Sequence, residues 1–148
     1  MIIHTIPEAS VDLAIADPSV MIASDAVPFV DGTGHPRGAG TFSRVLGVYV
    51  REKHTIPLML ALKKMTLMPA QRLEGISPGM KKKGRVQVGA DADLTLFDPA
   101  KFIDQATYSK LTRPAAGIPY VIVAGVPVVD HGEIVTAAYP GRGVKSGT

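Results

Sequence analysis

The stretch from Gly75 to Gly84 constrains the fold more than any other part of the sequence. It holds three glycines, one proline and three consecutive lysines. Glycine and proline interrupt regular secondary structure, and the residues before this stretch follow helical patterns while those after it follow strand patterns. We therefore predict a boundary here, with one unit over residues 1–74 and a second over residues 75–148.

The N-terminal unit combines helical patterns with one short apolar run. Residues 7–16 open with a proline and a glutamate, which suit the first turn of a helix. The apolar run at residues 20–23 is typical of a strand that is buried on both faces of a parallel sheet, and it ends at Asp25. Residues 26–40 are rich in glycine and proline and include Asp31, which predicts a long loop.

An amphipathic helix is expected after Thr55, which is placed to cap it. Its apolar face would consist of Leu58, Leu62 and Met65, and its opposite face of Lys63 and Lys64. Residues 70–73 are expected to add a further helical turn.

Strand patterns dominate the C-terminal unit. They fall at residues 85–88, 92–97, 120–124 and 126–129, and the last two are joined through Gly125 as in a hairpin. The predicted class is therefore α/β in the first unit followed by β in the second.

Composition excludes several kinds of protein. Cysteine is absent, so neither disulfides nor thiolate ligands are available. The net charge of +3 is matched by the three lysines of the central break, and aromatic residues make up 5% of the chain, so no nucleic-acid partner is expected. No apolar run approaches the roughly 20 residues that span a bilayer, and the first ten residues lack the order of a signal peptide. We therefore expect a cytoplasmic protein without a membrane partner.

Asp25 is the first candidate for chemistry, because it follows an apolar run and precedes a long loop. Side chains at the C-terminal ends of strands face the active site in α/β barrels, and a carboxylate there can bind a cation or take a proton from metal-bound water. The alternative is that Asp25 only caps the next turn. In the loop, His35 adjoins Pro36, and Arg37 could hold a substrate carboxylate or could be an ordinary surface arginine.

Several segments, in order, resemble the C-terminal third of D-aminoacylase-type amidohydrolases. The resemblance covers nearly the whole chain, and the order of the motifs makes it specific. The segments are Met21-Ile22-Ala23-Ser24-Asp25-Ala26, His35-Pro36-Arg37-Gly38, Gly40-Thr41-Phe42-Ser43-Arg44-Val45-Leu46-Gly47, Lys83-Gly84-Arg85, Gly89-Ala90-Asp91-Ala92-Asp93-Leu94, Phe97-Asp98-Pro99, Ala106-Thr107-Tyr108 and Pro140-Gly141-Arg142.

The resemblance implies the last strand and helix of an amidohydrolase (β/α)₈ barrel in residues 1–74. Residues 75–148 would supply the C-terminal strands of a small β-sandwich. In such enzymes, the aspartate that matches Asp25 lies beside zinc and moves a proton, so we expect Asp25 to be both a catalytic and a metal-site residue. The arginine that matches Arg37 suits the carboxylate of an N-acyl-D-amino acid, and we expect Arg37 and His35 to bind the substrate. Ala26 replaces the common glycine and resembles members that act on acidic N-acyl-D-amino acids.

The family's other zinc ligands have no counterpart in this sequence. A catalytic zinc ion usually has three protein ligands, so we expect the isolated chain to be inactive and to self-associate or to need a second chain that supplies the rest of the barrel. Two alternatives remain. The chain could be a non-catalytic assembly or stability module with a remnant aspartate, or a domain that binds small anions through Arg37.

Overall fold

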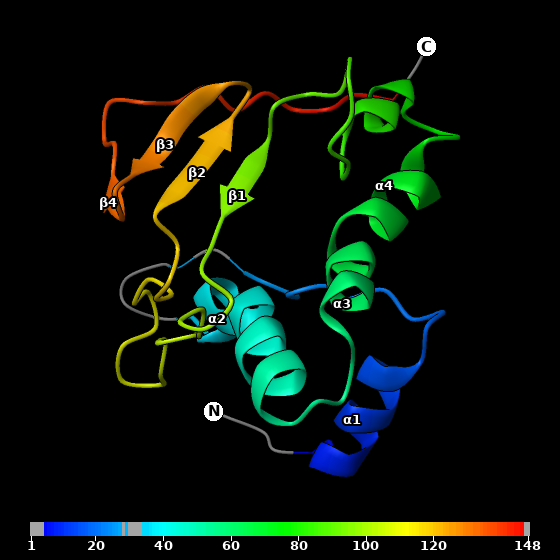
Figure 1. Ribbon diagram of the computed structural model, residues 1–148, viewed down its shortest axis with the longest axis vertical. Helices are drawn as coiled ribbons and strands as arrows, with labels where there is room; N and C mark the ends of the chain where they lie inside the picture. Colours follow the sequence, from blue (N-terminus) through cyan, green and yellow to red (C-terminus); the bar gives the residue numbers. More distant parts are fainter. Residues whose placement is uncertain (1–4, 28, 30–33, 147–148) are drawn as a thin grey trace.

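The computed structural model describes residues 5–27, 29 and 34–146 (Figure 1). Helices occupy the first part of the chain and a small sheet the second part. The helices are α1 (Glu8–Ala16), α2 (Arg37–Arg44), the π-helix η1 (Val45–Glu52), α3 (Leu58–Met65), α4 (Leu67–Leu73) and the 3₁₀ helix η2 (Pro78–Lys82). The strands are β1 (Leu94–Leu96), β2 (Tyr120–Val123), β3 (Val126–Asp130) and β4 (Glu133–Ile134).

The four strands form an antiparallel sheet in the order β1-β2-β3-β4. The predicted hairpin is confirmed, because β2 and β3 pair and Val123 lies opposite Val126. Its two turn residues, Ala124 and Gly125, have φ values of 49° and 81°, and positive φ at both central residues is what a tight two-residue hairpin turn needs. The predicted strand at residues 92–97 is also present, shortened to Leu94–Leu96.

The predicted strand at residues 85–88 is wrong, and the one predicted at residues 20–23 has no partner strand within the described residues. Residues 85–88 form no ladder, and Val86 and Val88 are exposed. Residues 20–23 lie extended beside α3, where the Ile22 N–H donates to the Lys64 carbonyl oxygen at 3.2 Å. A buried parallel strand needs a neighbouring strand to satisfy its backbone, and no described segment pairs with this one.

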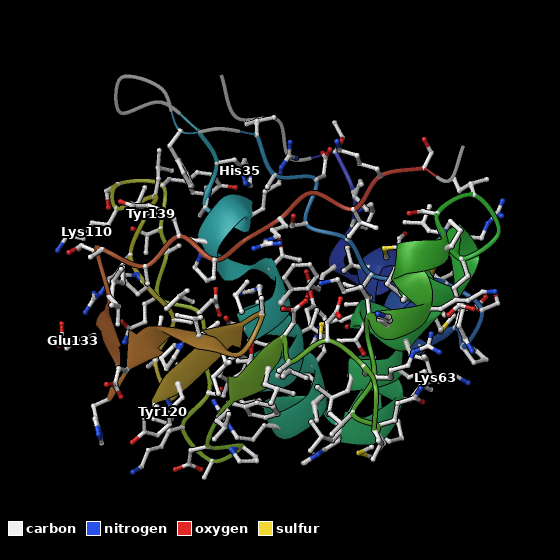
Figure 2. All side chains as sticks on the ribbon, turned by 90° about the horizontal axis from the view of Figure 1, so that it is seen from above. His35, Lys63, Lys110, Tyr120, Glu133 and Tyr139 are labelled. Carbon is white, nitrogen blue, oxygen red and sulfur yellow. The ribbon has the colours of Figure 1, made fainter. Side chains whose placement is uncertain are left out.

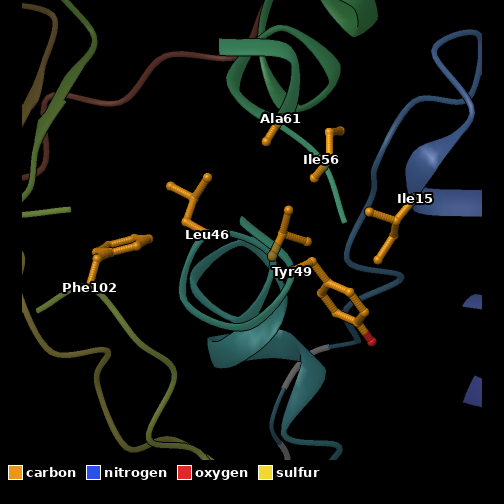
Figure 3. Packing of buried hydrophobic residues seen from close by; sticks show 7 residues of the cluster. Ile15, Leu46, Tyr49, Ile56, Ala61 and Phe102 are labelled. Atoms are coloured by element: carbon orange, nitrogen blue, oxygen red, sulfur yellow. The ribbon is translucent and has the colours of Figure 1, made fainter. Parts of the chain in front are cut away.

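The predicted loop at residues 26–40 ends sooner than expected, because α2 begins at Arg37 and continues directly into η1. Glycines and β-branched residues make this a poor helix by intrinsic propensity. Burial compensates, since the side chains of η1 supply much of the core (Figure 3). The buried apolar cluster consists of Ile15, Val45, Leu46, Tyr49, Ile56, Ala61 and Phe102.

Two glycines let this long helix approach the segment at residues 102–106 closely. A β-carbon on Gly40 would lie 3.2 Å from the Asp104 β-carbon, and one on Gly47 would lie 2.8 Å from the Phe102 carbonyl oxygen. Arg51, one turn after Gly47, donates from its guanidinium to the same carbonyl oxygen at 2.6 Å. The helix and this segment are therefore held at a fixed distance.

Replacing Gly47 with alanine is expected to lower the free energy of unfolding by about 1–3 kcal/mol, because the added methyl group meets a backbone oxygen that cannot move aside alone. The matched control is Gly75→Ala, where nothing lies within 4 Å of the new β-carbon and the change should stay within about 0.5 kcal/mol. Urea unfolding of both variants measures the difference. Equal unfolding curves would show that the close approach does not matter.

The amphipathic helix after Thr55 is present as α3, but two details differ from the prediction. Thr55 does not cap it; Pro57 occupies the N-cap position, and the Thr55 N–H donates to the Tyr49 carbonyl oxygen at 2.7 Å. Lys63 is exposed as expected, whereas Lys64 is fully buried. No helix among the described residues is long and apolar enough to cross a membrane.

Lys64 is buried because its ammonium group meets the end of α1. Nζ donates to the carbonyl oxygens of Ile15 at 2.5 Å, Asp17 at 2.6 Å and Ala14 at 3.4 Å. The last carbonyl groups of a helix lack intrahelical partners and carry the negative end of its dipole, so a cation satisfies them well. Lys64 thus ties α1 to α3.

Candidate functional site

A cleft of about 510 Å³ lies between the first turns of α2 and the segment at residues 104–108. His35 is one of the residues that line this cleft, and Figure 2 shows it next to the start of α2. Two arginines of one helix face, Arg37 and Arg44, contribute positive charge. The lining residues are Glu8, His35, Pro36, Arg37, Gly40, Thr41, Arg44, Asp104, Ala106, Thr107 and Tyr108.

Asp25 reaches this site through an ion pair. Its Oδ2 lies 2.9 Å from a terminal guanidinium nitrogen of Arg37, and its side chain is 82% exposed. The backbone of Asp25 has a φ of 50°, a left-handed conformation that aspartate tolerates better than most residues. The structure therefore brings the two sequence-predicted residues together, at the edge of the cleft and not within its lining.

Arg37 is held at several points. Its backbone N–H donates to His35 Nδ1 at 3.1 Å, and its carbonyl oxygen accepts the Thr41 hydroxyl proton at 2.9 Å. Its Nε is buried and has no hydrogen-bond partner within the described residues. Because an arginine can offer parallel N–H donors to a carboxylate, an anion in the cleft would suit this side chain.

The cleft also contains acidic groups that the sequence reading did not single out. Arg44 pairs with Asp104 at 3.5 Å. Glu8 accepts hydrogen bonds from Lys53 and the Tyr49 hydroxyl, and these hydrogen bonds hold the pKa of Glu8 below its ordinary value. Both acids of the lining therefore already have cationic partners, and Arg37 has Asp25 as its own partner at the edge of the cleft.

Tyr108 is a further residue of the site that the sequence reading did not single out. It lies 73 residues after His35 in the sequence, and its ring meets the His35 ring edge to face at a centroid distance of 5.3 Å. The motif Ala106-Thr107-Tyr108 contributed to the family resemblance, but its distance in sequence from His35 gave no sign that the two would meet.

The described residues do not fit a zinc ion by themselves. No group of three or more His, Asp or Glu side chains with metal-binding geometry occurs among residues 5–27, 29 and 34–146. Asp25 has an arginine as its near neighbour, and the two other histidines of the described chain, His54 and His131, lie outside the cleft lining. One carboxylate falls short of the three protein ligands that catalytic zinc sites usually have.

The fold is that of a segment of an amidohydrolase, because the chain superposes on solved D-aminoacylase structures. One structure, from a study of the binuclear metal centre of D-aminoacylase, matches with a TM-score of 0.79 and 40% sequence identity. The match covers 88% of this chain and 26% of that one. Another, the N-acyl-D-glutamate deacylase of Bordetella bronchiseptica with zinc and a phosphonate inhibitor, has a TM-score of 0.74 and 38% identity, over 82% and 24%.

Sequence comparison gives the same relationship. The chain is 42% identical to a D-aminoacylase of Alcaligenes xylosoxydans xylosoxydans over 135 residues, which is 91% of this chain and 26% of that protein. The chain is thus a partial homologue of D-aminoacylase and the N-acyl-D-amino-acid deacylases, and it spans about a quarter of their length. No protein-family model matches it. The resemblance inferred from the sequence motifs is confirmed, while the subtype is not resolved by these identities.

Proposed function

We propose that this chain contributes the C-terminal part of a zinc-dependent amidohydrolase that cleaves the amide bond of N-acyl-D-amino acids. The observation that carries the proposal is the homology with D-aminoacylase across nine-tenths of the chain. Residues 1–74 would complete the (β/α)₈ barrel and residues 75–148 the small β-sandwich. The extended segment at residues 20–23 would pair as a strand once the rest of the barrel lies beside it.

Within that enzyme, Arg37 would bind the carboxylate of the substrate, with His35 beside it in the cleft. The place of Arg37 in the cleft lining supports this role, because its side chain is partly exposed there and its guanidinium can offer paired donors to a carboxylate. Asp25 would act as the proton-transfer base near the metal, whose remaining ligands come from outside these residues. In the present arrangement Asp25 and Arg37 neutralise each other, and a substrate carboxylate would compete for Arg37.

Reconstitution tests this proposal. The purified 148-residue chain should bind zinc weakly and hydrolyse nothing measurable, because the described residues provide no three-ligand site. Mixed with a D-aminoacylase fragment that lacks its own matching quarter, it should bind zinc in stoichiometric amount and hydrolyse N-acetyl-D-amino acids. Acidic and neutral D substrates would define the subtype, and the L enantiomers serve as controls. Amidase turnover by the chain alone would contradict the proposal.

The geometry also supports a second candidate, a domain that binds small anions without catalysis. The cleft favours it, because Arg37 and Arg44 both line it. Calorimetric titration of acylated D-amino acids into the purified chain decides this point: a heat that disappears in an Arg37→Gln variant supports binding, and no heat at millimolar ligand removes this candidate.

A further inference from the structure

Both ring nitrogens of His35 have partners, which limits what this residue can do. Nδ1 lies 3.1 Å from the backbone nitrogen of Arg37 and accepts its proton. Nε2 lies 3.4 Å from the hydroxyl oxygen of Tyr108. A neutral imidazole has one donor and one acceptor nitrogen, so accepting at Nδ1 assigns the proton to Nε2, from which it points at the tyrosine oxygen.

The first of these contacts controls Arg37. An acceptor that takes the N–H of the residue two positions later forms a turn like the Asx turn of asparagine, and here that turn encloses Pro36, the N-cap residue of α2. It thereby satisfies the N–H of the first helical residue and fixes the direction in which α2 begins. Arg37 is the first residue of α2, so the direction of its side chain depends on this turn. The Thr41 hydroxyl, which donates to the Arg37 carbonyl oxygen, holds the same turn from the other side.

The second contact links this turn to the C-terminal unit. Tyr108 lies in a tight turn in which Thr107 and Lys110 exchange two backbone hydrogen bonds of 3.1 Å. The segment before it is fixed against α2 by the close approach of Gly40 to Asp104. The segment at residues 104–108 therefore contacts both the His35 ring, through Tyr108, and α2, through Asp104.

We propose that His35 and Tyr108 are positioning residues that act together on Arg37. His35 caps the first turn of α2 in its Nε2-protonated form, and Tyr108 holds the imidazole in place from the opposite wall of the cleft. His35 thus acts through Arg37, and it neither binds the substrate nor transfers a proton in the reaction. Only the kinetic consequence of this role rests on the proposed deacylase function; the structural role does not.

Nitrogen NMR on the 148-residue chain tests the structural role directly. Long-range ¹H–¹⁵N spectra at neutral pH should show His35 in the Nε2-protonated form, with Nδ1 as an acceptor. A Tyr108→Phe variant should shift the His35 Nε2 signal and leave that of His131 unchanged. A proton on Nδ1 in the unaltered chain would overturn the proposal. This measurement of the tautomer needs no variant. A His35 signal that does not respond to Tyr108→Phe would overturn the role of the tyrosine.

Kinetics of the reconstituted enzyme test the consequence. His35→Ala should raise KM roughly fivefold to tenfold, about the effect of losing one helix cap, with kcat changed less than about twofold. His35→Asn should restore KM, because its side-chain oxygen can accept the same Arg37 proton. Equal loss of kcat in both variants would show that the imidazole itself does chemistry and would overturn the proposal. If the unaltered reconstituted enzyme is inactive, the deacylase function fails, and the tautomer measurement still decides the role of His35.

Discussion

Replacing Lys64 with methionine is expected to lower the free energy of unfolding of this chain by about 2–4 kcal/mol, among the largest effects of any single substitution here. Methionine fills nearly the same volume but donates no hydrogen bond. Three carbonyl oxygens at the end of α1, those of Ala14, Ile15 and Asp17, would lose their shared donor. The Asp17 oxygen would keep the Val20 N–H at 3.3 Å, but the buried Ile15 oxygen would lose the ammonium donor, which is expensive. The ion–dipole attraction to the helix end would disappear as well.

Two effects oppose this loss without cancelling it. Burial lowers the pKa of Lys64, and the nearby Asp17 carboxylate partly offsets this by raising it. Removing the charge therefore also removes a desolvation penalty. Methionine would in addition add apolar contacts in the same space. Because three backbone acceptors share the one ammonium group, we expect the loss of their hydrogen bonds to outweigh both gains.

The neighbouring lysine provides the control. Lys63 is exposed, and Figure 2 shows its side chain at the periphery of the molecule, so Lys63→Met should change the free energy of unfolding by less than about 0.5 kcal/mol. Urea unfolding followed by circular dichroism measures both variants. If the two methionine variants unfold at the same urea concentration, Lys64 does not hold α1 in place. A variant too unstable to purify agrees with the prediction when Lys63→Met remains soluble.

The contrast between these two lysines shows where sequence periodicity fails. The pattern of α3 separated apolar residues from lysines and gave the helix correctly, but it treated both lysines alike. Which one becomes buried depends on where α1 ends in space, and that end is about 50 residues earlier in the sequence. Local pattern therefore predicted the element, and only the tertiary structure revealed the role of Lys64.

Strands show the same limit in another way. The hairpin of β2 and β3 was predictable, because its two strands are neighbours in sequence and its turn residues favour positive φ. Residues 20–23 and 85–88 have equally strong strand patterns but form no ladder within the described residues. Strand propensity shows that the side chains of a segment would fit on a sheet. A strand also needs a neighbouring strand to pair with, and local sequence does not reveal whether one is present.

The helical region from Arg37 to Glu52 was missed for the opposite reason: its local pattern is weak, but its burial is strong. Its glycines and valines argue against a helix locally, and burial of η1 side chains overrides them. This error also affected the site. His35 and Arg37 were expected in a loop, whereas Arg37 begins a helix, and its position there is what gives His35 a capping role. The family resemblance supplied the candidate residues, and the long-range contact with Tyr108 could come from the structure alone.

Replacing Asp25 with asparagine in the reconstituted enzyme is expected to lower kcat by about 10²- to 10⁴-fold, the range typical for removing a positioned acid–base group. Asparagine keeps the shape and can still accept a hydrogen bond from Arg37, so the ion pair at 2.9 Å becomes a neutral contact and the fold should be retained. Exposed ion pairs contribute roughly 0–1 kcal/mol to stability, so unfolding should scarcely change. The substitution therefore separates proton transfer from structure.

Three measurements together decide the role of Asp25: kcat, zinc content and the unfolding curve. Loss of turnover with zinc and stability retained supports the proton-transfer role, while loss of zinc together with turnover would identify Asp25 mainly as a ligand. Asp130→Asn, in the exposed end of β3 and outside the cleft lining, is the matched control and should leave kcat unchanged. Turnover within twofold of the unaltered enzyme would reduce Asp25 to an ion-pair partner of Arg37 and would remove the base from the proposed mechanism.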